Sequence, residues 1–249
     1  MVDSPHSYDA NGNLTSDGQN TIVYDAENRV VSDADGSGTA TYVYQASGHR
    51  VVKQLGDSTT VYIFSGDKVI AEYQGTTLSK EYIYLGNQQL AGYLYGTLSY
   101  YLPDRLSNRV VTDTSGNILG QQGNYPFGES WYGSGTTTEW QFTSYERDAE
   151  SGNDYAIARE YENRLARFSA LDTAKPCLSD PQQFNRYSYV ANDPINRLDP
   201  TGSNFRFCIG GCNAGAAALA IGSLFVGEVD APGILIGLLL CYGSCFYRY

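Results

Sequence analysis

Basic residues, histidine and methionine are scarce in this chain of 249 residues. It contains 16 Lys and Arg against 27 Asp and Glu, which gives a formal net charge of −11 at pH 7, with two His and one Met. An acidic surface repels phosphate backbones, so the composition argues against nucleic acid as a partner. Because the two His and the Cys residues show no spacing typical of zinc, we expect no metal site and no cofactor.

A secretory leader is also missing from the first residues. A signal peptide needs a basic stretch followed by an apolar one, whereas the chain starts MVDSPHSYDANGN, which is polar and acidic. This start lies inside a repeat, as if the chain were cut from something longer. The apolar runs lie at the other end, and neither 214–227 nor 233–241 reaches the roughly 20 residues of a membrane-spanning helix.

The abundant residues are 27 Gly and 22 Tyr, and many of them recur in a repeat. YDANGNL begins at Tyr8, YDAENRV at Tyr24 and YQASGHRV at Tyr44, with weaker echoes at Tyr62 and Tyr84. The steps between these tyrosines are 16, 20, 18 and 22 residues. Each unit has a short alternating run that ends in Tyr, which predicts a strand. The Asp, Asn and Gly that follow provide the positive-φ positions of a tight turn.

The units therefore predict a ladder of β-hairpins over 1–132. The predicted strands include 41–44, 50–55, 61–64 and 81–84. Tyrosines two apart share one face of a strand, and such pairs are Tyr42/Tyr44, Tyr82/Tyr84 and Tyr93/Tyr95. One hairpin cannot bury its faces alone, so neighbouring units must stack. Two other interpretations stay open: a disordered tract rich in Tyr and Gly, and an ordinary β-sandwich.

The Tyr-Asp repeat resembles the YD repeats of RHS proteins, and further motifs follow in order. YYLPDRLSNRVVTD starts at Tyr100, YPFGE at Tyr125, FTSYERDAESGNDY at Phe142 and AREY at Ala158, while NRYSYVANDPINRLDPTG covers 185–202. These segments are similar to the family's Tyr-Tyr…Asp-His-Leu-Gly-Ser segment, its Pro-Phe-Gly-Glu turn and its repeat-associated core. The chain thus resembles the C-terminal region of an RHS protein over residues 8–202.

The resemblance implies a mainly β fold in three parts. Stacked hairpin repeats in a spiralling sheet occupy 1–132, the RHS core forms a plug over 133–202, and a hydrophobic tail, which we expect to be helical, covers 203–249. RHS proteins hold such a variable tail, often a toxin, inside a hollow shell. In many members the core cuts the chain after its Asp-Pro-x-Gly motif by means of aspartates. Two carboxylates that share a proton suit this chemistry, because one activates water while the other protonates the leaving group.

The same resemblance indicates the residues for such a cut. The family's Gly-Arg-Phe-x-x-x-Asp-Pro segment corresponds to 166–173, so Asp172 is the candidate catalytic carboxylate. The candidate partners are Asp180, Asp193 and Asp199. The scissile region is Gly202 and Ser203.

Three positions depart from the family's pattern. Ala166 stands for the usual Gly, Thr173 for the usual Pro, and Ser203 for the usual Leu. A leucine would dock in an apolar pocket, and a serine gives up about 1.5–3 kcal/mol of that burial. These departures leave the competence for self-cleavage an open question at the level of sequence.

Simpler structural interpretations exist for the same side chains. Asp193 and Asp199 each precede a proline, and Asp-Pro is an ordinary turn initiator. Arg147, Arg159 and Arg167 lie among acidic residues, which is typical of salt-bridged or solvated side chains.

The segment 203–249 differs from the rest in composition. Its two arginines balance its two acidic residues, and it holds four of the five cysteines: Cys208, Cys212, Cys241 and Cys245. Disulfides 208/245 and 212/241 would suit an antiparallel helical hairpin in an oxidising compartment, and metal binding by the same thiols is the alternative. Three interpretations of the tail stay open: a membrane-active segment, a cargo fragment enclosed by a shell, and an inactive remnant. No nuclease, protease or transferase motif occurs in it.

We therefore expect the C-terminal part of a bacterial RHS-repeat protein that encloses and presents its own tail, secreted or at the cell surface. The expected partners are that tail or the rest of an RHS shell, together with a membrane through 203–249. Any enzymatic step would be a single-turnover self-cleavage. One alternative is a membrane-active toxin that inserts 203–249 into a bilayer. Another is a carbohydrate- or surface-binding β module, although cross-strand packing accounts for the many tyrosines as well.

Overall fold

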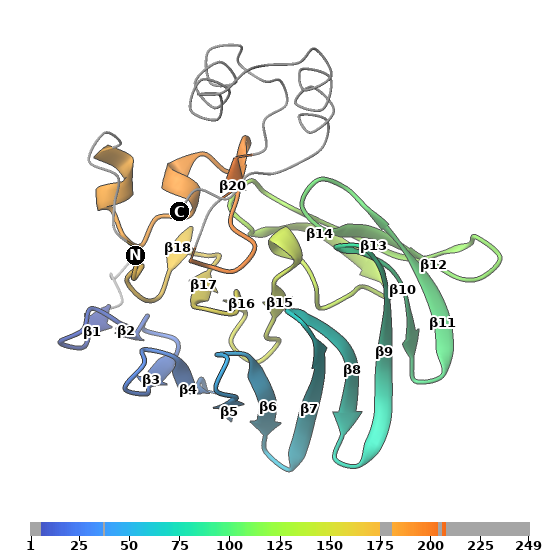
Figure 1. Ribbon diagram of the computed structural model, residues 1–249, viewed down its shortest axis with the longest axis horizontal. Coiled ribbons are helices and arrows are strands. Elements are labelled where there is room, and N and C mark those ends of the chain that lie inside the picture. Colours follow the sequence, from blue (N-terminus) through green and yellow to red (C-terminus); the bar gives the residue numbers. More distant parts are fainter. Residues whose placement is uncertain (1–5, 37, 175–180, 204–205, 208–249) are drawn as a thin grey trace, which may run out of the picture.

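The computed structural model describes residues 6–36, 38–174, 181–203 and 206–207. These residues form β-strands joined by turns and three short 3-10 helices (Figure 1). The strands of the large sheet are β1 (Ser7–Tyr8), β2 (Leu14–Ser16), β3 (Thr21–Tyr24), β4 (Val30–Ala34), β5 (Thr39–Tyr44), β6 (Arg50–Leu55), β7 (Ser58–Ser65), β8 (Lys68–Gln74), β9 (Thr77–Leu85), β10 (Gln88–Leu94), β11 (Thr97–Pro103), β12 (Asn108–Thr112), β13 (Ile118–Asn124) and β14 (Ser130–Gly135).

This sheet is a continuous antiparallel ladder of 14 strands in chain order. Each strand pairs with the next one along the chain, and among the described strands β1 and β14 form its two open edges. The sheet curves around the rest of the molecule, from β1 through β7 to β14 (Figure 1). The predicted ladder of hairpins and its spiralling, mainly β fold are therefore confirmed.

One pattern of hydrogen bonds to an aspartate recurs in three of the hairpin turns. In Asp9, Asp25 and Asp113, Oδ1 accepts hydrogen bonds from the backbone N–H groups two and four residues further on, at 2.8–3.0 Å. Gly12 and Gly116 take the positive φ that two of these turns require, +83° and +84°. The Asp of the Tyr-Asp repeat is thus the residue that closes the turn.

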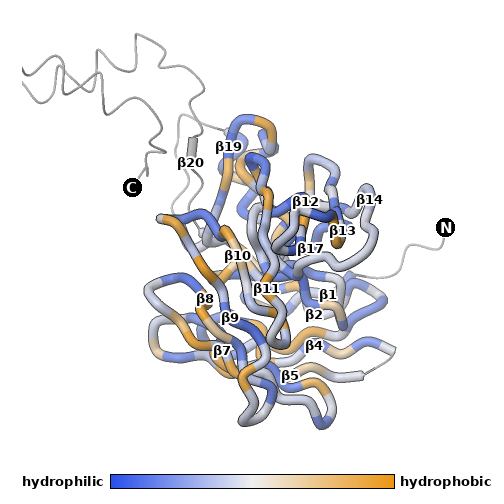
Figure 2. The backbone as a smooth tube through the Cα atoms, turned by 90° about the vertical axis from the view of Figure 1, so that its right-hand side faces the viewer, coloured by the Kyte–Doolittle hydropathy of each residue, from blue (hydrophilic) through white to orange (hydrophobic). Residues whose placement is uncertain are grey.

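Several tyrosines of the ladder, among them Tyr42, Tyr62 and Tyr82, lie on the inner face of the sheet. Tyr42 and Tyr82 are buried, and the phenol of Tyr44 donates a hydrogen bond of 2.6 Å to the carbonyl of Val30 in the preceding hairpin. Tyr95 is different, because it lies beyond the end of β10 in a turn, with φ +50° and 75% of its surface exposed. Along strands such as β7, β8 and β9 the hydropathy alternates instead of being uniformly apolar (Figure 2).

The second part of the structure lies in the concavity of this sheet (Figure 1). Residues 136–203, called the plug below, contain β15 (Glu146–Arg147), β16 (Asp154–Tyr155), β17 (Glu160–Glu162), β18 (Arg167–Phe168), β19 (Arg197–Leu198) and the 3-10 helices η1 (Phe142–Ser144), η2 (Pro181–Phe184) and η3 (Val190–Asn192). The strand β20 (Arg206–Phe207) pairs with β19. An aromatic core of Phe142, Tyr145, Tyr161, Phe168 and Tyr189 holds the plug together. The boundaries at 132/133 and 202/203 stay predictions.

The plug contacts the inner face at points spread along the ladder. The N–H of Leu14 donates to the carbonyl of Ser169 at 2.8 Å, and the N–H of Arg50 donates to the phenol of Tyr155 at 2.8 Å. Further along, Lys80 lies 2.6 Å from the Glu139 carboxylate. These contacts fix how the plug, and every site on it, is placed against the sheet.

Candidate functional site

The predicted scissile region is a tight turn packed against the plug. Oδ1 of Asp199 accepts hydrogen bonds from the N–H of Gly202 at 2.9 Å and of Thr201 at 3.3 Å. Gly202 has φ +73°, and a Cβ atom added to it would lie 2.7 Å from the carbonyl oxygen of Ala156. Only glycine fits both the conformation and the space.

Arg159 is the residue that joins this turn to Asp172. Its Nε–H donates to the carbonyl oxygen of Gly202, and its Nη2 lies 3.1 Å from Oδ2 of Asp172 and 3.9 Å from Oδ2 of Asp199. The guanidinium lies over the ring of Phe168, 3.7 Å from its centroid. The structure therefore brings Asp172, Asp199 and the carbonyl of Gly202 together on one buried guanidinium.

Arg159 places a charged donor on the carbonyl oxygen of Gly202. Burial lowers the pKa of Arg159, while the neighbouring carboxylates Asp172 and Asp199 act in the opposite direction. A guanidinium keeps its charge in proteins. A fixed donor on a carbonyl oxygen polarises the C=O bond and stabilises the oxyanion that forms when water attacks the carbon.

The other predicted residues have different places. Oδ1 of Asp193 accepts from the backbone and side-chain N–H groups of Asn196, and its Oδ2 lies 3.6 Å from Nε of Arg197, so it caps a separate turn. Oγ of Ser203 lies 3.2 Å from Oγ1 of Thr201. Asp180 and the four tail cysteines lie outside the described residues.

The contact of Arg159 with Gly202 was not predicted from the sequence. The interpretation as a salt-bridged residue fits Arg147, which pairs with Asp154 at 2.8 Å, and it fits the pair between Arg159 and Asp172. No periodicity connects Arg159 with a carbonyl 43 residues away. Its only signal was its position in the AREY segment of the core motif.

The described part of the chain shows no group of three or more His, Cys, Asp or Glu side chains arranged to hold a metal ion. A search of the same residues for a helix long and apolar enough to cross a membrane found none. Most of 203–249 lies outside that search, so membrane contact through this segment has no support here and stays a prediction.

Comparison with known proteins shows likeness in sequence and in fold. No family model matches the chain. The tRNA3(Ser)-specific nuclease WapA of Bacillus spizizenii is 31% identical over 217 residues, which cover 80% of this chain and 9% of that protein. The tRNA(Glu)-specific nuclease WapA of Bacillus subtilis subsp. natto is 31% identical over 232 residues, 86% of this chain and 10% of that protein.

Solved structures of toxin components share the fold. The crystal structure of TcdB2-TccC3 superposes with a TM-score of 0.63 at 19% identity, over 78% of this chain and 11% of that one. The Photorhabdus luminescens Tc holotoxin pore gives a TM-score of 0.62 at 20% identity, over 78% and 10%. The chain spans about a tenth of the length of all these relatives. In fold, the chain is therefore an RHS-type protein, built as a spiralling antiparallel sheet around a plug.

Proposed function

We propose that this chain is the C-terminal part of a bacterial RHS-repeat toxin, secreted or displayed at the cell surface, whose sheet and plug enclose and present a variable C-terminal tail. The observation that carries the proposal is the plug itself, which lies in the concavity of the sheet and is bonded to it from Leu14 to Lys80. The tRNA nuclease and toxin names of the relatives support a toxin system.

We further infer that the plug cuts its own chain between Gly202 and Ser203. The carbonyl oxygen of Gly202 accepts a hydrogen bond from Arg159, and the carboxylates of Asp172 and Asp199 flank the same guanidinium. An electrophile, a donor for the developing oxyanion and two carboxylates are the groups that hydrolysis of a peptide bond uses.

The proposed reaction is hydrolysis with water as the only co-reactant. One carboxylate takes a proton from the water as its oxygen bonds to the carbonyl carbon of Gly202, and the negative charge on the carbonyl oxygen is held by Arg159. The other carboxyl group gives a proton to the amide nitrogen of Ser203 as the C–N bond breaks. The products are a carboxylate at Gly202 and an amine at Ser203, and the acid and base roles are exchanged at the end of the single turnover.

N-terminal sequencing of the purified chain after storage tests the cleavage. Ser203 is the expected first residue of the smaller piece. A first residue elsewhere would contradict the assigned bond, and a chain with Met1 as its only N-terminus would contradict the cleavage.

Enclosure of the tail is tested separately by adding a protease to the intact, non-denatured chain. The segment 203–249 should be degraded more slowly than the same sequence supplied as a free peptide. Degradation at equal rates would contradict enclosure, while leaving the result on cleavage unaffected.

A further inference from the structure

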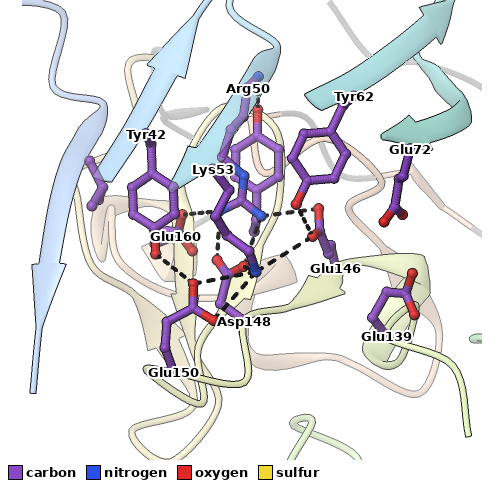
Figure 3. A network of polar contacts seen from close by, with 12 residues as sticks. Tyr42, Arg50, Lys53, Tyr62, Glu72, Glu139, Glu146, Asp148, Glu150 and Glu160 are labelled. Atoms are coloured by element: carbon purple, nitrogen blue, oxygen red, sulfur yellow. Dashed lines mark hydrogen bonds and ion pairs between the residues drawn. The ribbon is translucent and has the colours of Figure 1, made fainter. Parts of the chain in front are cut away.

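A buried cluster of charges joins the plug to strands β4 to β6 (Figure 3). At its centre Arg50 lies 1% exposed, with Nη1 2.6 Å from Oδ2 of Asp148 and Nη2 3.0 Å from Oε2 of Glu146. Its guanidinium also lies 4.2 Å from the ring centroid of Tyr155 and 4.8 Å from that of Tyr42. The sheet thus contributes a cation, and the plug contributes the anions that bind it.

Carboxyl groups outnumber cations in this interface among the described residues. The carboxyl groups are Asp17 and Asp33 from the sheet and Glu146, Asp148, Glu150, Glu160 and Glu162 from the plug. The cations that pair with them are Arg50, Lys53 and Arg164. Ionisation of every member would leave several buried negative charges without compensation.

Three of these carboxyl groups lack the partners that an ionised carboxylate needs. Neither oxygen of Glu160 has a hydrogen-bond partner within the described residues, and its nearest cation is Nη1 of Arg50 at 3.8 Å. Oε2 of Glu162 and Oδ1 of Asp33 are also buried without a hydrogen-bond partner among the described residues, while Oε1 of Glu162 accepts from Nδ2 of Asn153 at 3.0 Å. The guanidinium of Arg164 is 3.9 Å from Glu162. A buried, unpaired carboxylate is costly, so such a group takes up a proton instead.

Burial and nearby negative charges also favour the protonated form of these three carboxyl groups. Burial, followed by the nearby Asp148, raises the pKa of Glu160 well above its usual value. Burial, followed by Asp17, raises the pKa of Glu162 to about 8, and burial, followed by Asp148, raises that of Asp33 to about 7.

The groups that face these three come from both sides of the interface. From the sheet side they are Asp17, Asp35, Arg50, Lys53, and the phenols of Tyr24, Tyr42 and Tyr44. From the plug they are Glu146, Asp148, Glu150, Tyr155, Arg164 and Arg167. Arg50, Lys53 and Arg164 are already bound to Asp148, Glu146 or Asp17, and Arg167 donates a hydrogen bond of 2.9 Å to the phenol of Tyr8. These cations therefore do not offset all the remaining carboxylates.

We propose that protonated carboxyl groups of Glu160, Glu162 and Asp33 dock the plug on the sheet, and that alkaline pH releases it. In the folded chain these groups hold protons that the unfolded chain gives up near pH 4, so their contribution is complete below that pH and is lost as the pH rises toward 8. Deprotonation places like charges from β4 and β17 against each other across the interface. The inference deepens the proposed role of the plug, and it holds whether or not the plug cuts the chain.

Urea unfolding of the full chain at pH 5, 7 and 9 tests the proposal. Trp140 of the plug lies edge-on to Tyr82 of the sheet, 5.9 Å between ring centroids, so its emission reports docking once the exposed Trp131 is replaced in a Trp131→Phe background. The urea midpoint should fall from pH 5 to pH 9, with at least a tenfold rise in the unfolding constant. Glu160→Gln and Glu162→Gln should change the midpoint little at pH 5 and raise it at pH 9, because glutamine keeps the neutral form.

The matched control is Glu81→Gln, on the exposed outer side of β9, which should follow the wild-type pH profile. A midpoint that rises steadily from pH 5 to pH 9, or glutamine variants that lower it equally at both pH values, would overturn the proposal.

Hydrogen exchange of the unchanged chain gives a second test that needs no variant. After correction for the intrinsic rate, the interface amides of Leu14 and Arg50 should lose protection at pH 9, while amides within the β7–β8 pair keep it. Equal protection of both sets at pH 5 and pH 9 would contradict release. Because this readout is independent of the state of the Gly202–Ser203 bond, failure of self-cleavage leaves the test intact.

Discussion

Arg159 donates its Nε–H to the carbonyl oxygen of Gly202, 43 residues further along the chain. The same guanidinium is paired with Asp172 and lies near Asp199. One buried side chain therefore positions the electrophilic carbonyl and both carboxylates of the proposed hydrolysis. The predictions for Asp172, Asp199, Arg159 and Gly202 all depend on these contacts.

The two carboxylates should both be required for cutting. Asp172→Asn and Asp199→Asn each remove a group that carries a proton, so the rate of cleavage should fall by about 10²–10⁴-fold. The fraction of cut chain, followed with time after purification, measures this. Asp193→Asn is the matched control, because Asp193 also precedes a proline but caps a separate turn. Normal cutting by either of the first two variants would remove that residue from the mechanism.

Arg159 should be needed for its shape as well as for its charge. Arg159→Gln removes the cation from the carbonyl oxygen, and loss of one such donor costs about 10²–10³-fold in rate. Arg159→Lys keeps a charge without the planar fork, so an intermediate rate is expected. Equal rates for wild type and Arg159→Gln would show that the contact with Gly202 is structural.

Substitution of Gly202 should disturb the turn by two separable effects. In Gly202→Ala the new Cβ meets the carbonyl of Ala156 and takes an unfavourable positive φ, which together should destabilise the chain by about 1–3 kcal/mol and slow cutting. Gly152→Ala is the control, since Gly152 has φ +74° but open space around its Cα. Urea unfolding compares the two variants, and equal losses would show that the close approach to Ala156 contributes nothing.

The buried Arg50 should matter far more for stability than an exposed arginine. Arg50→Gln leaves Asp148 and Glu146 buried with Lys53 as the cation that remains beside them. Breaking a buried pair in this way costs about 3–5 kcal/mol. Arg29→Gln, which removes a partly exposed pair with Asp25, should cost about 1 kcal/mol or less. The measurement is the free energy of unfolding in urea, and a similar loss for both variants would contradict the central role of Arg50.

Acid should weaken the same interface because it protonates Asp148. Burial acts to raise the pKa of Asp148, but Arg50 and Lys53 outweigh it and hold that pKa below its usual value. A lowered pKa contributes stability that is present above the unfolded value near 4 and is lost as the pH falls through the folded value. Circular dichroism should therefore show acid unfolding below about pH 4, with maximal stability between that limit and the alkaline release. Full stability at pH 2 would contradict this role of Asp148.

The fold could be predicted from the sequence because the residues that specify its turns and strands lie close together along the chain. The turn at Asp25 depends on residues within four positions, and the strand alternation around Tyr42 has the period of two that any β-strand shows. The sequence pattern placed Tyr93 and Tyr95 together on a strand, but Tyr95 lies in the following turn. Turn boundaries are decided by hairpin register, which a periodic pattern specifies poorly.

The site was less accessible to sequence reasoning because its contacts are distant along the chain. Asp172 was found through a motif, whereas the pairing of Arg50 with Asp148, 98 residues apart, follows only from how the sheet wraps around the plug. Asp199 was interpreted as a turn residue, and its side chain does bond to the N–H of Gly202. The proposed role of Asp199 beside Arg159 depends on the packing of residues 156–159 against that turn.

The intact mass of the freshly purified full chain tests the central claim most directly. The account predicts two species whose masses correspond to 1–202 and 203–249, and a single uncut mass for Asp172→Asn prepared in parallel. A single uncut mass for the wild-type chain would contradict self-cleavage, and two species from both chains would contradict the assignment of Asp172.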